Sequence, residues 1–156
     1  MCFDIHNSHP TEKKATEDIV CYKRLEVYLG DVPPDKITKG NIYKVEYFTP
    51  YCGQRIYLEQ KPLKKSKLDV RFFNTTIERG LHSYSDSRKA LSRCTNGEVV
   101  VKCIIPKGSR YYYNPVDKEY VSNKLQYTNK FVVKACQNLF SVKINDKKLI
   151  SEQVLM

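Results

Sequence analysis

The stretch EVVVKCIIPKGSRYYY, residues 98–113, decides the fold. Its first half, 98–105, is the most apolar run in the chain, which predicts a central strand covered on both faces. Pro106 and Gly108 then predict a type II turn, because proline presets the first φ angle and glycine two positions later tolerates the positive one. Residues 109–113 should leave that turn as another strand.

Further strands are predicted on both sides of this stretch, from short runs that mix apolar and polar residues. These runs are 18–29, 41–48, 55–59, 68–73 and 119–128, and 131–144 is apolar enough for a strand pair or a short helix. One helix is predicted from Asp86 to Arg93, because the hydroxyl of Ser85 or Ser87 can cap its first turn. The pattern predicts an α+β fold with mainly antiparallel, twisted sheets and one short helix on one face. The predicted core consists of Val20, Leu25, Val99, Val101, Ile104, Ile105, Val121, Leu125 and Val132.

The length of 156 residues fits a single domain, with a polar N-terminal segment at 1–17 and a C-terminal tail at 145–156. The first ten residues lack the apolar stretch of a secretion signal, and no window approaches the roughly 20 apolar residues of a membrane helix. We therefore expect a soluble protein without a membrane partner, in the cytoplasm of a bacterium or of a phage-infected cell.

Charge is the strongest global signal, at +10 with a pI near 9.3. Such a balance predicts attraction to anions such as nucleic acid, nucleotide phosphates or acidic proteins. Part of the charge lies in a lysine-rich run around Pro62, which we expect to be an exposed, solvated loop. Its lysines are Lys61, Lys64, Lys65 and Lys67.

The cysteines are predicted to be free thiols in a reducing compartment, because the six are widely and irregularly spaced in a chain too large to need disulfides. No local pair of cysteines or of cysteine and histidine has the spacing of a zinc site, so no metal site is predicted. His6 and His9 lie three apart, in a segment that is better explained as a polar terminus.

Four motifs follow one another along the chain: VCYKR at 20–24, GLHSY at 80–84, VKCIIPKGS at 101–109 and DKEY at 117–120. The last three resemble the second half of small ADP-ribosyltransferases, in which a strand bearing Ser or Tyr, a helix and a strand with a turn precede a strand bearing Glu. The first lies where that family has its Tyr-Arg or His motif. The whole chain also resembles small bacterial and phage proteins.

The resemblance implies a pocket for NAD or another nucleotide, with or without catalysis. Glu119 would stabilise the positive charge that builds on the ribose as nicotinamide leaves, with Asp117 on the same face of the strand. Lys23 or Arg24 would hold the diphosphate, and Tyr84 would stack on nicotinamide. The other ligand-binding residues that the motifs imply are Tyr22, His82 and Ser83.

Two features depart from the family pattern. Asp117 stands where transferases acting on arginine have the first glutamate, and a lysine stands where the family has its arginine, which alone can make a bidentate fork to a diphosphate. Glu119 could instead be a solvent-facing carboxylate paired with a lysine, and His82 a structural histidine. The transferase hypothesis requires that the acidic strand and the Lys23–Arg24 pair line one cleft.

An alternative without catalysis is a basic module that binds nucleic acid or a protein. Tyr111, Tyr112 and Tyr113 follow Arg110 on one predicted strand, and aromatic rings beside positive charge are typical of sites for single-stranded nucleic acid. Because side chains alternate along a strand, Tyr112 should face away from Tyr111 and Tyr113. The purely structural explanation is that the tyrosines cover a β-sheet, where aromatic residues pack well.

Overall fold

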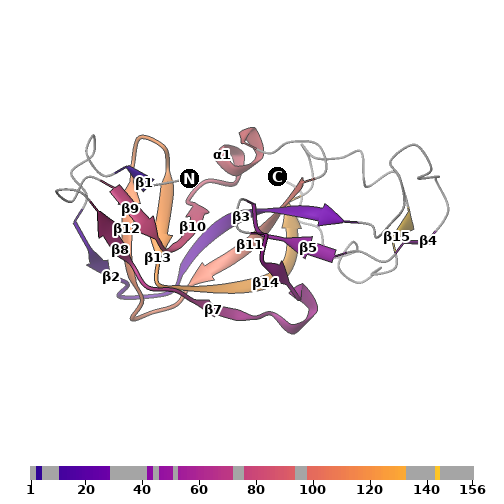
Figure 1. Ribbon diagram of the computed structural model, residues 1–156, viewed down its shortest axis with the longest axis horizontal. Coiled ribbons are helices and arrows are strands. Elements are labelled where there is room, and N and C mark those ends of the chain that lie inside the picture. The colour runs from indigo at the N-terminus through magenta and orange to yellow at the C-terminus, as the bar shows by residue number, and fades with distance from the viewer. Residues whose placement is uncertain are drawn as a thin grey trace.

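The computed structural model describes residues 3–4, 11–28, 42–43, 46–50, 53–71, 76–93, 98–132 and 143–144. Within these ranges the protein is mostly antiparallel β-sheet with one short α-helix, as the sequence predicts (Figure 1). None of its described helical segments has the length and apolar character needed to cross a membrane. The predicted C-terminal tail lies outside the described residues, as does most of 131–144.

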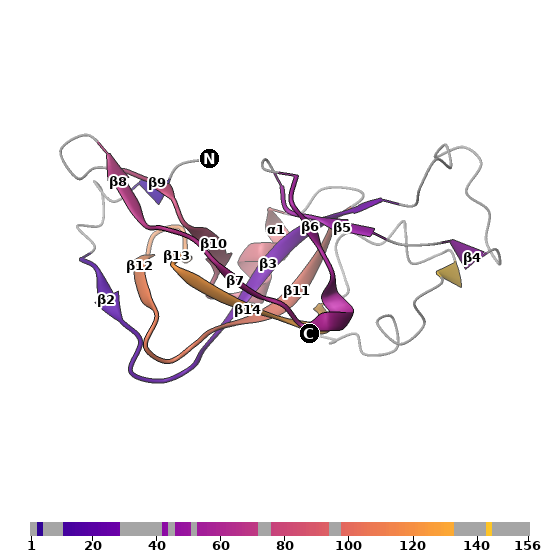
Figure 2. The same ribbon diagram turned by 60° about the horizontal axis from the view of Figure 1, so that its bottom comes forward.

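The main sheet is open and strongly curved, and its strands run in the order β2-β12-β13-β10-β3-β11-β14-β7, with β5 added to β3 and β6 to β5 (Figures 1 and 2). Its strands are β2 (Lys13–Lys14), β3 (Ile19–Tyr28), β5 (Glu46–Phe48), β6 (Arg55–Ile56), β7 (Leu63–Lys65), β10 (Leu81–Tyr84), β11 (Glu98–Ile105), β12 (Arg110–Asn114), β13 (Glu119–Ser122) and β14 (Lys124–Val132).

Two smaller sheets flank it in the described residues. One has the order β1-β9-β8, with β1 at Phe3–Asp4, β8 at Asp69–Arg71 and β9 at Thr76–Arg79. The other pairs β15 (Lys143–Ile144) with β4 (Ile42–Tyr43) in parallel.

Strand β11 is central, as its apolar run predicts. It pairs with β3 along its whole length, from Glu98 opposite Glu26 to Ile105 opposite Ile19. On its other side it pairs with β14, whose register shifts between Val101 and Cys103. Each side chain on these strands can therefore be assigned to one of two faces, because cross-strand partners share a face and neighbours alternate.

The inner face carries the main core. Its buried residues are Cys21, Leu25, Tyr47, Ile56, Leu58, Val99, Val101, Cys103, Ile105, Leu125, Tyr127 and Phe131. The outer face carries a smaller cluster beneath α1 (Ser87–Ser92), which contacts β3, β10 and β11. That cluster contains Tyr84, Ala90, Val100 and Val132, with Tyr22 and Leu91 packed against it.

The N-cap of the helix lies one residue away from each predicted cap. Asp86 is the N-cap, and its carboxylate accepts a hydrogen bond from the backbone amide of Arg88 at 2.8 Å. A carboxylate at this position satisfies an unpaired amide of the first turn and interacts favourably with the helix dipole. The prediction that Ser85 or Ser87 caps the helix is wrong.

Two predicted core residues are not buried. Val20 is 45% exposed and Ile104 is half-buried, because both lie on the outer face beyond the area that α1 covers. The remaining predicted core residues are buried.

Three local predictions also need correction. The lysine-rich run is not a loop throughout, since Leu63–Lys65 forms β7 and pairs with β14. The predicted strand at 55–59 ends at Ile56 and gives way to a 3₁₀ helix at Leu58–Gln60. Pro106 and Gly108 do form a turn, but Pro106 is its first residue, because the Pro106 carbonyl accepts from the Ser109 amide. Gly108 is therefore the third residue of the turn, and it has a positive φ of 87°.

Candidate functional site

His82 and Glu119 form a pair on the outer face, held by two neighbouring strands. Strand β10 pairs with β13 so that Tyr84 lies opposite Glu119 and His82 opposite Val121. The His82 Nδ1 atom lies 2.8 Å from the Glu119 Oε1 atom, and the two side chains are 27% and 12% exposed. No described residue bonds the Nε2 atom of His82.

The contact between His82 and Glu119 determines what the histidine ring can do chemically. A carboxylate on Nδ1 favours the tautomer that carries the proton there, which leaves Nε2 able to accept a proton or to bind a ligand donor. The pair could therefore serve as a base or as a ligand contact. A structural role in joining β10 to β13 is equally compatible with it.

Lys23 and Arg24, which the resemblance assigns to diphosphate binding, point to opposite faces of the sheet. Arg24 lies on the outer face, where its Nη1 donates to the Arg93 carbonyl at 2.6 Å and lies 3.3 Å from Glu98 Oε1. Lys23 lies on the inner face, and its ammonium donates to the backbone carbonyl of His82 at 2.8 Å. Only Arg24 shares a face with Glu119, and β10 separates their strands.

Lys23 has a structural explanation. Strands β10 and β3 pair only at Tyr84 and Tyr22, so the two strands separate toward His82. A buried backbone carbonyl needs a donor, and the Lys23 ammonium supplies one where the β-ladder ends.

The two tyrosines expected in the nucleotide site pack beneath α1. Tyr84 is 8% exposed and belongs to the cluster with Ala90 and Val100, against which the half-buried Tyr22 also packs. The Tyr84 ring is therefore covered by the helix, and the structure leaves little of it for stacking on nicotinamide.

Ser83 and Asp117 are separated from the His82–Glu119 pair. Ser83 is buried on the inner face, and its hydroxyl has no hydrogen-bond partner among the described residues. Asp117 lies in the turn before β13 and not on the strand itself; its carboxylate accepts from the Asn114 side-chain amide at 3.2 Å. Its other partner is Arg93, at 3.9 Å.

Cys21 and Cys103 are free and buried, as the sequence predicts. They lie directly opposite each other on β3 and β11. Burial raises the pKa of Cys21 to about 12, although the nearby Ser83 hydroxyl opposes the shift, and burial likewise raises the pKa of Cys103. Thiols in this state are poor nucleophiles, so both act as packing residues.

A second candidate site lies where four segments distant in the sequence meet. We call it the basic corner, and it consists of Lys14, Lys65, Lys67, Arg110 and Lys124. Lys124 lies opposite Lys65, and Arg110 lies opposite Lys14.

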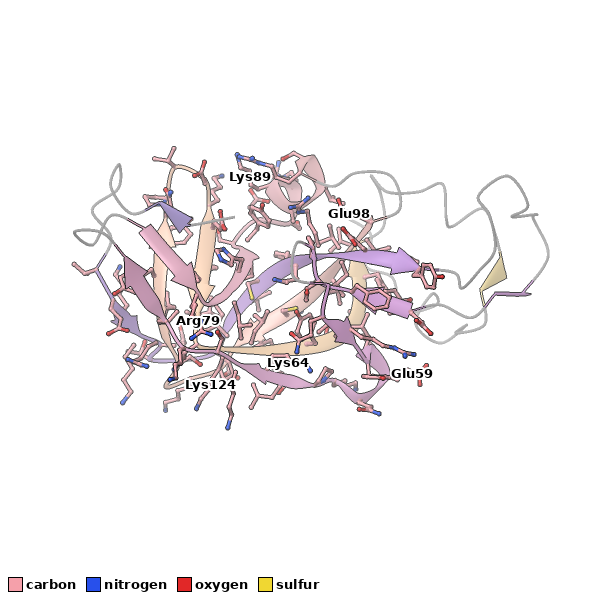
Figure 3. All side chains as sticks on the ribbon, in the orientation of Figure 1. Glu59, Lys64, Arg79, Lys89, Glu98 and Lys124 are labelled. Atoms are coloured by element: carbon pink, nitrogen blue, oxygen red, sulfur yellow. The ribbon has the colours of Figure 1, made fainter. Side chains whose placement is uncertain are left out.

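Asn123 joins the two halves of the basic corner. Its carbonyl accepts from the Ser66 amide at 2.9 Å, and its side chain accepts from the Arg110 amide at 2.9 Å. Figure 3 shows Lys124 and Lys64 at the edge of the molecule opposite Lys89 on α1. Topology thus brings together charges that the sequence keeps far apart.

The basic corner has little negative charge to balance it. Among the described side chains, its one ion pair joins Arg110 to Glu12 at 3.4 Å, between groups that are 55% and 39% exposed. The lysines of the corner form no ion pair with any described residue. Five cationic side chains with one carboxylate among their described partners produce a positive surface potential.

Of the three consecutive tyrosines, only Tyr112 belongs to the outer face. Tyr111 and Tyr113 both pack on Tyr120, with ring centroids 5.8 and 4.7 Å apart, which confirms the predicted alternation. Tyr112 lies near Arg110 and Glu12, and its pKa is raised by partial burial and by the Glu12 charge. It is therefore the tyrosine best placed to contact a ligand of the basic corner.

The chain matches no known protein family, no curated protein and no solved structure. Its function must therefore be argued from its own residues.

Proposed function

We propose that this protein binds nucleic acid through the basic corner. The observation that carries the proposal is the lack of carboxylate partners for Lys14, Lys65, Lys67 and Lys124 among the described residues. Like charges opposite each other on adjacent strands destabilise a sheet, yet Lys65 and Lys124 occupy such positions. A phosphate backbone would remove that repulsion and release its counterions on binding.

Nucleic acid is favoured over other anions by what surrounds these charges. Tyr112 lies beside Arg110, so a planar ring is within the same surface as the cationic groups. Aromatic side chains next to a basic groove are the usual means of holding nucleotides without sequence preference.

The test is the binding of a fluorescent 12-nucleotide strand, followed by anisotropy. The K65A/K124A double variant should lose about tenfold in affinity at low salt, since each exposed ion pair contributes up to about 1 kcal/mol. The control is K89A, which removes one positive charge from α1, where Lys89 is half-buried. Equal affinities of the wild type, the double variant and K89A would refute the proposal.

We propose a second candidate, a nucleotide site at His82 and Glu119. The supporting observation is the 2.8 Å contact on Nδ1, with no described partner on Nε2. Arg24 shares the outer face but already binds Glu98 and the Arg93 carbonyl, so a phosphate would have to compete with them. NAD or ADP-ribose should raise the unfolding temperature of the wild type and not that of E119A. A wild-type protein with no shift at millimolar nucleotide would remove this candidate.

A further inference from the structure

The outer face of the main sheet carries a row of four residues, three of them apolar, next to the basic corner. Ile104 lies opposite Val20 on β3 and opposite Gln126 on β14, and Gln126 lies opposite Leu63 on β7. The four residues thus form one continuous row across four strands. We call Val20, Ile104 and Leu63 the apolar strip.

The apolar strip is accessible. Val20 is 45% exposed and Leu63 is 44% exposed, whereas Ile104 between them is half-buried. The helix covers a neighbouring part of this face, where Tyr22 and Val100 pack against it. Single exposed apolar residues need no explanation. Here Val20 and Ile104 lie on adjoining strands, and the half-buried Gln126 of β14 connects them to Leu63.

Lysines lie on both sides of the strip. Lys124 and Lys65 are each two residues from the row, along β14 and β7, and belong to the same face. Lys102 lies two residues from Ile104 on the other side, along β11. Two residues of strand span about 7 Å, so positive charges flank the strip at that spacing.

We propose that the ligand of the basic corner is single-stranded nucleic acid, with its bases on the apolar strip and its phosphates along Lys65 and Lys124. This inference rests on the proposed function and names its substrate class. A single strand presents planar apolar bases beside its phosphates. A duplex keeps its bases stacked inside, and poly-glutamate has no planar apolar group for the strip.

The test compares a 12-nucleotide thymidine strand with an abasic deoxyribose phosphate strand of the same length, for the wild type and L63S. The wild type should bind the thymidine strand about tenfold more tightly, since burial of one large apolar side chain corresponds to about that factor. L63S should lose most of this difference and bind the abasic strand as the wild type does.

The matched control is V116S, which changes an apolar residue that is 69% exposed in the turn before β13. It should bind both strands like the wild type. Circular dichroism of L63S should show an unchanged fold, because Leu63 is on an exposed position of β7.

The remaining outcomes distinguish the two proposals. Equal binding of the thymidine and abasic strands by the wild type would overturn the placement of bases on the strip but leave the basic corner as a phosphate site. Binding of a 12-base-pair duplex or of poly-glutamate as tight as that of the thymidine strand would overturn the substrate class. No binding of any strand would overturn both proposals.

Discussion

The surface near α1 and the basic corner differ in whether their charged side chains form ion pairs. Beside the helix, Arg24 lies 3.3 Å from Glu98, and Lys118 lies 3.5 Å from the cap residue Asp86. At the basic corner, Lys65 lies opposite another lysine, and no described carboxylate pairs with either. The first surface satisfies its charges internally, so they stabilise the fold. The second leaves its lysines without an ion pair among the described residues, which is the basis of the proposed function.

The largest predicted effect is the loss of the ion pair between Arg24 and Glu98 near α1. R24A should lower the free energy of unfolding by about 3 kcal/mol, because it removes a 3.3 Å ion pair with the carboxylate of Glu98, which is only 7% exposed. Urea denaturation measures the loss. R88A is the control, since Arg88 is 84% exposed in its 3.9 Å pair with Asp86 and its removal should change stability by less than about 1 kcal/mol.

An intermediate effect is expected at the helix cap. D86A should cost about 1 kcal/mol, whereas D86N should keep the cap, because an amide oxygen also accepts from the Arg88 amide. If D86A and D86N were equally stable, the cap would be unimportant.

The same residue predicts a pH dependence. The hydrogen bond from the Arg88 amide lowers the Asp86 pKa below its ordinary value of 3.8, so its folded pKa lies below its unfolded pKa. Its stabilisation is therefore complete above the unfolded pKa and is lost as pH falls through the lower folded value. The stability difference between the wild type and D86N should shift toward D86N below about pH 4, which thermal unfolding at stepped pH measures.

The smallest predicted effect on stability is at the basic corner. K65A should raise the free energy of unfolding by a few tenths of a kcal/mol at low salt, because it removes the repulsion with Lys124. High salt should abolish the gain, since it screens exposed charges. A loss of stability that is independent of salt would mean that Lys65 contributes through packing.

The sequence predicts strands β3 and β11 and the helix well because local signals control them. The apolar run of β11 is mostly buried, and Asp86 lies beside both predicted caps. Strand β7 is missed because its lysines carry no alternating pattern and only pairing with β14 makes it a strand.

The candidate sites also contain some features that local sequence predicts and others that depend on strand pairing. Alternation along β3 is enough to show that Lys23 and Arg24 face opposite sides, so the sequence alone could have limited the cleft with Glu119 to one of the two. The strand pairing shows that this residue is Arg24. The contact between His82 and Glu119, and the basic corner, depend on which strands are neighbours. No local pattern brings residues 14, 65, 110 and 124 together.

The salt dependence of strand binding tests the central claim most directly. Each phosphate contact on a single strand contributes about 0.7 to the slope of log affinity against log salt. The K65A/K124A variant should therefore have a slope smaller by about 1.4 than the wild type, with K89A unchanged. Equal slopes for all three proteins would contradict the assignment of the basic corner as the phosphate-binding surface.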